Sequence, residues 1–300
     1  MKEIKAKTIL NKTKRRDPWF LDDYTINPYS GCSFNCLYCY IRGSKYGEHM
    51  ERKLSIKTNA PALLEKALVM RAKKGEHGII VLSSATDPYL QAEKETGLTR
   101  QLLEIILKYQ FPVHMITKSD LIIRDLDLLK EIDKQAILPE DLKSMGRGAL
   151  ITFSFSTIEE KVASIFEPGA TSPKARLDTL LHCSQEGFLT GVSMMPLLPW
   201  ISDTTTQLAA MFNAFKANKA HYAFPAHLVL YGNEPADSKK LVLNAIKKHY
   251  PMHLEKYESY FSRGNDMPGF YKNAFYKKME ALGKQYELPN RIYQPISLSP

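Results

Sequence analysis

Three of the four cysteines in this 300-residue chain lie close together, in the stretch NPYSGCSFNCLYCY. Cys32, Cys36 and Cys39 have the spacing C-x3-C-x2-C, and thiolates at these separations on one loop can converge on a single site. Two kinds of site use such a set. A structural zinc site closes its shell with four protein ligands, whereas an iron–sulfur cluster held by three cysteines leaves one iron open for chemistry.

A zinc site would need a fourth ligand. That ligand would have to be His49 or the distant Cys183, and neither belongs to a second CxxC or HxxxH half-site. The spacing therefore favours a cluster with three cysteine ligands, and zinc stays open as the alternative.

The cellular compartment decides whether these cysteines form disulfides or stay reduced. The N-terminal stretch MKEIKAKTILNKTKRRDPWF is basic but lacks the apolar core of a signal peptide. No apolar run reaches the roughly 18–20 residues that span a bilayer. We therefore expect a cytoplasmic protein without a membrane partner, in which thiols stay reduced and serve metal binding or catalysis rather than disulfides.

The composition is that of a soluble globular protein, with 44% hydrophobic and 24% charged residues. The length allows one large α/β domain or two ordinary ones. The net charge of +9 suggests a polyanionic partner such as DNA. Because lysines and arginines are spread along the chain, the charge suggests a partner without naming it.

Short β-rich runs alternate with longer segments of helical period. Strands are expected at residues 23–27, 78–83, 112–117, 149–155, 190–195 and 226–231. Helices are expected at residues 59–74, 98–108, 121–132 and 204–217, and one more from the N-cap Ser172 toward Gly187. This alternation predicts an α/β fold with a parallel sheet, most simply a full or partial βα barrel, with a doubly wound open sheet as the alternative.

Polar residues follow three of these strands. SSATD begins at Ser83, TKSD begins at Thr117, and Ser154 and Ser156 end the strand near Phe153. Ligands of parallel α/β proteins bind at the carboxyl ends of the strands, so we expect these three endings on one rim.

No repeat or linker forces a division into two domains. We expect a basic segment at residues 1–23, the barrel at residues 24–232 and a helical C-terminal extension, packed on the barrel, at residues 233–300. The sequence gives no indication of the oligomeric state.

The cysteine stretch resembles that of the radical S-adenosylmethionine (SAM) enzymes, whose motif is C-x3-C-x-Φ-C with an aromatic residue at Φ. Tyr38 stands at Φ here. The resemblance implies a partial (βα)6 TIM-like barrel and a [4Fe-4S] cluster on Cys32, Cys36 and Cys39. It also implies that the open iron binds SAM, that one-electron reduction gives a 5′-deoxyadenosyl radical, and that this radical abstracts hydrogen from a substrate. A flavodoxin or ferredoxin is the expected reducing partner.

A closer resemblance is to the spore photoproduct lyase-like branch, often called DNA repair photolyases. It rests on the stretches YTINPYSGCSFNCLYCYIRG, SSATDPYLQAEKETGLTRQLLE, TKSDLIIRDLDLL, FSFSTIEE, FEPGATSPKARLDTLL and MMPLLPWISD, in that order. The resemblance covers about residues 20 to 205, and the C-terminal third matches only loosely. The resemblance implies reversal of a methylene-bridged thymine dimer in DNA.

One departure from that branch concerns the hydrogen donor. The lyase uses a cysteine thiol in the turn after the second strand, where this chain has Ser83 or Ser84. A serine O–H bond is too strong to quench a thymine-allyl type radical. Cys183 is the remaining thiol and is expected to be a small buried side chain. Tyr40, directly after Cys39, is then expected either to pack or to transfer hydrogen.

The resemblance also indicates which residues contact the cofactor. Expected contacts are Tyr38, Ser84, Thr86, Lys118, Ser154, Ser156 and Arg176. Tyr38 would lie against the adenine or the cluster, Thr86 near the methionine moiety, and Lys118 near the cofactor carboxylate. Arg176 would clamp a carboxylate in a bidentate way, or pair with Asp178 or Glu167 as a surface ion pair.

Three functions remain at this stage. The first is a lyase-type radical SAM enzyme acting on a thymine lesion in DNA. The second is a radical SAM enzyme acting on a peptide, an RNA base or a metabolite, which the missing donor thiol favours. The third is a nucleic-acid-binding protein with a structural zinc ion or an inert cluster.

Overall fold

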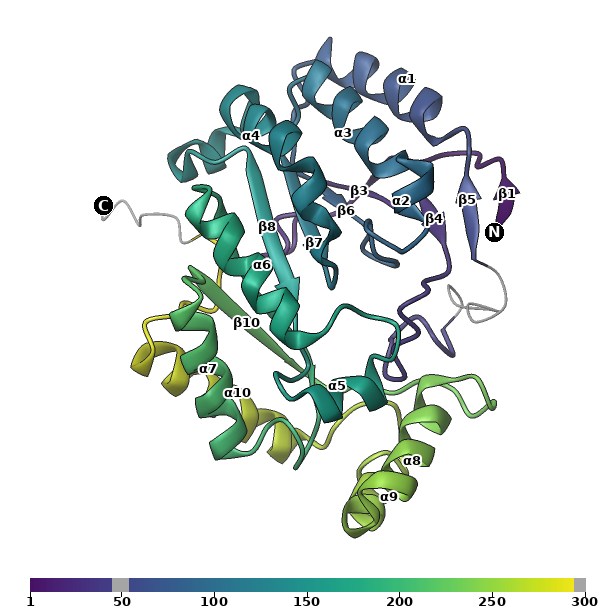
Figure 1. Cartoon of the computed structure of the whole chain (residues 1–300), viewed down its shortest axis with the longest axis vertical. Helices are drawn as coiled ribbons and strands as arrows, with labels where there is room; N and C mark the ends of the chain where they lie inside the picture. Colours follow the sequence, from purple (N-terminus) through teal and green to yellow (C-terminus); the bar gives the residue numbers. More distant parts are fainter. Residues whose placement is uncertain (45–53, 294–300) are drawn as a thin grey trace.

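The computed structural model describes residues 1–44 and 54–293, and a twisted parallel sheet covered by helices dominates it (Figure 1). Six parallel strands neighbour one another in the order in which they occur in the chain, which is the order of a βα barrel. They are β3 (Tyr24–Ile26), β6 (Ile80–Leu82), β7 (Val113–Thr117), β8 (Ala149–Ser154), β9 (Leu189–Leu197) and β10 (Tyr222–His227). β2 (Asn11–Lys12) joins β3 in antiparallel fashion. Among the described strands none joins β10 to β2, so the fold is the expected partial (βα)6 TIM-like barrel.

Helices lie between the strands and cover the outer face of the sheet (Figure 1). They are α1 (Ala60–Ala72), α2 (Glu93–Thr96), α3 (Leu98–Lys108), α4 (Leu126–Gln135), α5 (Glu160–Phe166), α6 (Pro173–Gln185) and α7 (Thr205–Ala217). Short 3-10 helices occur at η1 (Asp120–Asp125), η2 (Glu140–Met145) and η3 (Pro251–His253). A small second sheet combines β1 (Lys2–Ile4), β5 (Ser55–Lys57) and β4 (Tyr29–Ser30), and β4 leads into the cysteine stretch.

The expected strands are confirmed except the last, which was placed four residues too late. β10 starts at Tyr222 and contains Pro225, which has no N–H to donate to a neighbouring strand. The proline is tolerated because β10 pairs only with β9, and the register shifts just after Pro225. A proline in an edge strand therefore misled the prediction.

The expected helices are present, with one change. Residues 121–132 were expected as one helix, whereas η1 ends at Asp125 and α4 continues to Gln135. α3 has the expected ends. The Ser172 hydroxyl accepts a hydrogen bond from Ala175 N at 3.3 Å, and Gly187 has a φ of +89° that suits its place after α6.

The amino end of the barrel is closed by the chain's N-terminal segment. Trp19 stacks on Phe224 with ring centroids 6.1 Å apart, and the Phe20 carbonyl is 2.7 Å from His114 Nδ1. Asp23 accepts a hydrogen bond from Ile79 N at 2.9 Å. The space between the strands is therefore filled by side chains at this end.

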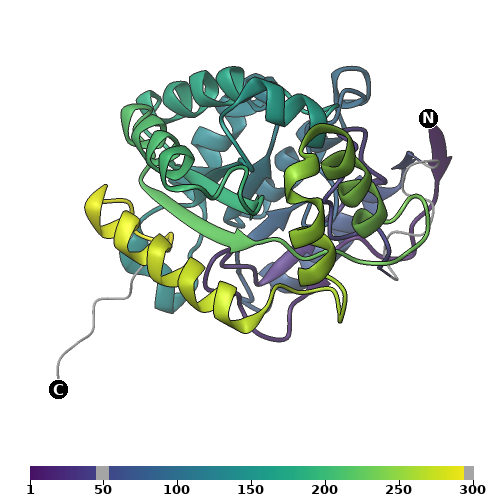
Figure 2. The ribbon, with the colours of Figure 1, turned by 90° about the horizontal axis from the view of Figure 1, so that it is seen from below.

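The C-terminal extension is helical, as expected. It contains α8 (Ser238–His249), α9 (Leu254–Tyr260) and α10 (Gly269–Gln285). Figure 2 looks onto the carboxyl ends of the strands, where α8 and α9 stand beside the barrel and α10 runs along β10. The boundaries at residues 23 and 232 stay predictions. In the described part of the chain, no helix has both the length and the apolarity needed to cross a membrane.

Candidate functional site

The cysteine loop is a series of tight turns. Asn35 N donates to Cys32 O at 3.3 Å, Cys39 N to Cys36 O at 3.3 Å, and Arg42 N to Cys39 O at 3.0 Å. Asn35 adopts a positive φ of 53°, which asparagine tolerates. Because each cysteine carbonyl starts a turn, the loop curls, and all three cysteines line one cavity.

Contacts from a distant segment hold this loop from behind. Leu37 N donates to Phe166 O at 2.9 Å, and Gly169 N donates to Phe34 O at 3.0 Å. Gly169 is required here, since a Cβ atom at this position would lie 2.3 Å from Ser33 O. The FEPG turn at the end of α5, residues 166–169, therefore packs closely against the cysteine loop.

The cavity has a volume of about 400 Å³ and lies at the carboxyl ends of the strands. Its lining includes the three cysteines, Tyr38, Tyr40, residues 83–87, Lys118, Ser154, Ser193, Met195, Ala226 and His227. The three polar strand endings therefore meet on one rim, as parallel strands predict. Of the residues expected to contact the cofactor, Tyr38, Ser84, Thr86, Lys118 and Ser154 line this cavity.

Two buried hydroxyls of this lining have no protein partner. Ser83 Oγ and Thr86 Oγ1 make no hydrogen bond within the described residues. A buried hydroxyl without a partner costs free energy, so these two atoms indicate that a polar ligand completes the site.

The three thiols fit a metal cluster. Burial raises the pKa of Cys36 to about 12 and also raises the pKa values of Cys32 and Cys39. The thiols are therefore protonated at neutral pH until a metal displaces their protons. In the described part of the chain, no group of three or more His, Cys, Asp and Glu side chains is arranged around one metal ion. A cluster makes a different demand, because each cysteine binds a separate iron.

The fourth cysteine lies away from the other three. Cys183 is fully buried in the hydrophobic core on α6 and does not line the cavity. Burial also raises its pKa to about 12. His49 lies outside the described residues.

Asp87 fixes the loop after β6. Its carboxylate accepts hydrogen bonds from Thr117 Oγ1 at 2.7 Å, Lys118 N at 2.8 Å and Tyr89 N at 2.9 Å. Burial raises the pKa of Asp87 despite these bonds. Asp87 thus joins the end of β7 to the loop that carries Thr86.

Lys118 provides a positive charge in the cavity. Its ammonium lies 5.9 Å from the centre of the Tyr38 ring. Burial acts to lower the pKa of Lys118, but the neighbouring Cys36 and Glu167 outweigh it and raise the pKa above its ordinary value. The side chain therefore stays charged and suits an anionic group of a ligand.

The sequence offered Glu167 only as a possible ion-pair partner of Arg176, and its link to the cysteine motif was not expected. Its carboxylate accepts hydrogen bonds from Ser156 Oγ at 2.9 Å, from Arg176 at 2.5 Å and from the Tyr38 hydroxyl. Burial acts to raise the pKa of Glu167, but the charges of Arg176 and Lys118 outweigh it and lower the pKa. Glu167 thus anchors the aromatic residue of the cysteine motif.

This network corrects one expectation about Arg176. Arg176 is fully buried and pairs with Glu167 beneath the loop, rather than on the surface. Its other nitrogen donates to Ser154 O at 2.6 Å. Neither Ser156 nor Arg176 lines the cavity, so this geometry gives them a supporting position, and direct contact with the cofactor stays a prediction.

Tyr40 lies at the outer part of the cavity. Its side chain is 52% exposed, and its hydroxyl donates to the carbonyl oxygen of Ser84. The phenol is therefore accessible beside the cysteine loop.

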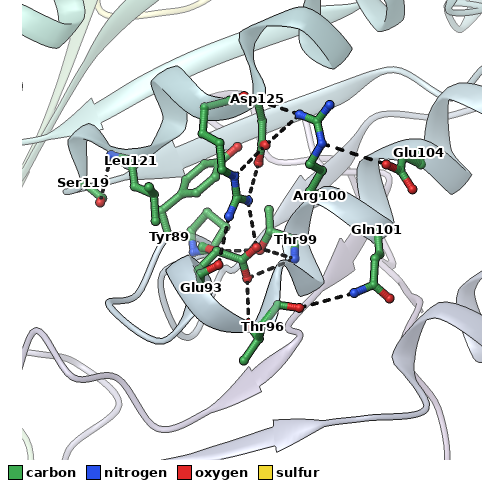
Figure 3. Close-up of polar contacts among 12 residues, drawn as sticks. Tyr89, Glu93, Thr96, Thr99, Arg100, Gln101, Glu104, Ser119, Leu121 and Asp125 are labelled. Carbon is green, nitrogen blue, oxygen red and sulfur yellow. Dashed lines mark hydrogen bonds and ion pairs between the residues drawn. The ribbon is translucent and has the colours of Figure 1, made fainter.

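A second buried network lies at the loop after β6, and Figure 3 shows part of it, including Glu93, Thr99 and Asp125. Glu93 is fully buried and accepts hydrogen bonds from Thr99 N at 3.0 Å, from Arg124 at 2.8 Å and from the Tyr29 hydroxyl. Asp125, also fully buried, accepts from Arg124 at 2.7 Å. Since Tyr29 lies in β4, directly before the cysteines, this network fixes one loop relative to the other.

Comparison with known families identifies the class of the protein. The model of the Radical SAM superfamily matches residues 26–212, which is more than half of the chain. The chain therefore belongs to the radical SAM superfamily. Membership implies a [4Fe-4S] cluster and SAM, and the three cysteines that would hold the cluster lie inside the matched segment.

Proteins of similar sequence occur in other organisms. An uncharacterized protein of Methanocaldococcus jannaschii is 29% identical over 267 residues, covering 82% of this chain and 93% of that protein. An uncharacterized protein of Mycobacterium tuberculosis is 24% identical over 292 residues, covering 95% and 81%. The names of these two proteins state no activity.

Solved structures with the same fold include spore photoproduct lyase complexed with dinucleoside spore photoproduct. That structure has a TM-score of 0.62 at 15% identity and covers 95% of this chain and 78% of that chain. A mutant of the lyase with bound AdoMet and dinucleoside spore photoproduct has a TM-score of 0.60 at 15% identity, with the same coverage. At this identity the likeness shows a shared fold, in agreement with the resemblance to the lyase-like branch.

Proposed function

We propose that this chain is a lyase-type radical SAM enzyme that acts on a thymine lesion in DNA. The observation that carries the radical chemistry is the cavity, where three cysteines meet the unpartnered hydroxyls of Ser83 and Thr86. The DNA assignment is supported by the net charge of +9 and by the fold shared with spore photoproduct lyase.

The residues of the cavity would have separate roles. Cys32, Cys36 and Cys39 would hold the cluster, and Thr86 and Lys118 would bind polar and anionic groups of SAM. When bound, the reduced cluster and SAM supply a 5′-deoxyadenosyl radical that abstracts hydrogen from the substrate. The protein's own part is to place the substrate carbon against SAM and to keep water out.

A second candidate function has one observation in its favour. Ser83 and Ser84 line the cavity where a lyase of this branch would place its donor thiol, and Cys183 lies away from it. A radical SAM enzyme acting on a peptide, an RNA base or a metabolite would not need that thiol. If the substrate is a thymine lesion, Tyr40 is the first residue to test as hydrogen donor, because its phenol is accessible at the cavity.

The decisive experiment uses anaerobically reconstituted protein, dithionite as the electron source, and SAM. Iron and sulfide are counted, and 5′-deoxyadenosine is measured by mass spectrometry. We expect the cluster and 5′-deoxyadenosine in the wild type and in Cys183→Ala, whose thiol lies outside the cavity, and the loss of both in Cys36→Ala. Zinc in place of iron and sulfide would support a nucleic-acid-binding protein with a structural metal and overturn the radical assignment.

A further arm tests the substrate. Ultraviolet-irradiated DNA containing spore photoproduct is added, and restored thymidine is quantified. Restored thymidine that depends on Cys36 would support the lyase assignment, and its loss in Tyr40→Phe would assign the donor. 5′-Deoxyadenosine without restored thymidine would reject the repair assignment and favour the second candidate.

A further inference from the structure

Helix α8 exposes one row of lysines. Lys240, Lys247 and Lys248 are exposed and, with Asn244, lie on the side of the helix opposite the buried Val242. Within the described residues none of the three lysines forms an ion pair or a side-chain hydrogen bond. The row therefore presents uncompensated positive charge to solvent.

Helix stability explains only part of this row. Lys247 and Lys248 lie in the last turn, where cations interact favourably with the helix dipole. Lys240 lies in the first turn, where a cation is unfavourable, and no acidic residue of that turn offsets it. Its neighbour Lys239 has a structural role, since its ammonium donates to Phe261 O at 2.5 Å. Lys240 has no such role, so its charge calls for another partner.

The row begins next to the cysteine loop. Arg42 donates to Ala236 O at 3.1 Å, and Ser238 Oγ, at the start of α8, donates to Arg42 O at 3.4 Å. α8 and α9 stand at the carboxyl end of the barrel (Figures 1 and 2), and the cavity lies at the same end. A polymer lying along α8 would therefore pass close to the site.

Most of the chain's net charge is found in this region. Residues 238–286 contain ten lysines and arginines and four aspartates and glutamates, which gives +6 of the total of +9. The charge is thus concentrated in the C-terminal helices, α8 among them, rather than spread evenly along the chain, and this distribution complements a polyanion.

We propose that the lysine row of α8 is a docking track for the sugar–phosphate backbone of duplex DNA. This inference rests on the proposed function and adds the surface that would hold the substrate outside the cavity. Lys240 and Lys247 are separated by about 10 Å along the helix axis. That length matches about three phosphates of one DNA strand, so the row can contact consecutive phosphates.

The test compares two triple variants by fluorescence anisotropy with a labelled 20-base-pair duplex at several KCl concentrations. One variant replaces Lys240, Lys247 and Lys248 with glutamine. The matched control replaces Lys66, Lys73 and Lys74, which are exposed at α1, at the opposite end of the molecule (Figure 1). Both variants lose the same charge, so only position distinguishes them.

We expect the α8 variant to bind the duplex about 10- to 100-fold more weakly. The slope of its plot of log affinity against log salt should become less steep by about 2.7, which is about 0.9 for each phosphate that is no longer neutralised. The α1 control should bind as the wild type does. Asn244→Lys, which extends the row, should bind more tightly and steepen the plot by about 0.9. This gain cannot arise from misfolding.

Three results would overturn the docking track: equal loss in both triple variants, no loss in the α8 variant, or an α8-dependent preference for duplex RNA or polyglutamate over DNA. The formation of 5′-deoxyadenosine without DNA is measured in parallel and should be the same in all variants. If wild-type protein forms none while the α8 variant still loses DNA, the proposed enzymatic function fails and the docking track stands.

Discussion

The two ends of the barrel differ in whether particular buried polar groups have hydrogen-bond partners. At the amino end, His114 lies between Phe20 O and Thr152 Oγ1, at 2.7 and 2.5 Å, and Thr152 also contacts the Tyr222 hydroxyl at 2.7 Å. At the carboxyl end, the buried hydroxyls of Ser83 and Thr86 have no partner within the described residues. The first arrangement is complete without a ligand, whereas the second is not.

This difference separates stability from binding. A buried polar group with partners contributes to folding, and its removal destabilises the protein. A buried polar group without a partner contributes only when a ligand arrives. Substitutions at the amino end should therefore change the free energy of unfolding, and substitutions at the unpartnered hydroxyls should change ligand affinity.

The largest effect is expected at Glu167, a carboxyl-end residue that has hydrogen-bond partners as the amino-end groups do. Glu167→Ala would leave the charge of fully buried Arg176 unpaired beneath the cysteine loop. The free energy of unfolding should fall by about 3–5 kcal/mol, measured by urea titration. Glu104→Ala is the control, because Glu104 is 56% exposed, and it should change stability by less than about 0.5 kcal/mol. A loss below about 1 kcal/mol for Glu167→Ala would contradict the anchoring role.

A pH dependence is expected at the amino end. Burial lowers the pKa of His114 from 6.5 to about 4, so the folded protein binds this proton less readily than the unfolded chain does. The stability due to neutral His114 is complete above pH 6.5 and is lost as the pH falls toward 4, by about 3 kcal/mol at most. Urea titrations at pH 7, 5.5 and 4.5 should show this loss. If the free energy of unfolding of His114→Gln falls equally with pH, other titratable groups cause the loss.

The smallest effects form a matched pair of isosteric substitutions. Thr86→Val should leave stability unchanged within about 0.5 kcal/mol and weaken SAM binding to the reconstituted protein about 5- to 10-fold, the equivalent of one hydrogen bond. Thr152→Val should do the opposite, with a loss of about 1–3 kcal/mol in unfolding free energy and unchanged SAM affinity. Calorimetric titration and urea unfolding measure both. The same response at the two positions would remove the distinction between the ends.

Much of the fold followed from local patterns. Strands such as β7 and β8 are runs of apolar residues ended by polar ones, and such runs can be read directly from the sequence. The meeting of Thr86, Lys118 and Ser154 on one rim followed from parallel topology alone. The cysteine spacing indicated three candidate metal ligands, because ligands on one loop are close together in the sequence.

The supporting network could not be predicted in the same way. Glu167 and Tyr38 are separated by 129 residues, and no spacing rule relates positions so far apart. The sequence offered Glu167 only as one of two acidic residues near Arg176, and burial decided between them. A signal was nevertheless present, since a glutamate between Phe166 and Pro168, two residues before a glycine, is an unusual setting for a surface carboxylate.

The contact between the cysteine loop and the FEPG turn also sets an order of events during synthesis. Leu37 can donate to Phe166, and Phe34 can accept from Gly169, only after the later segment has been made. At roughly 5–20 residues per second, the ribosome needs on the order of 10 s to make the intervening segment. The loop therefore acquires its final shape long after its own residues emerge. We therefore expect the three cysteines to reach their final arrangement late in synthesis, and a truncated chain that ends before Phe166 should not retain iron.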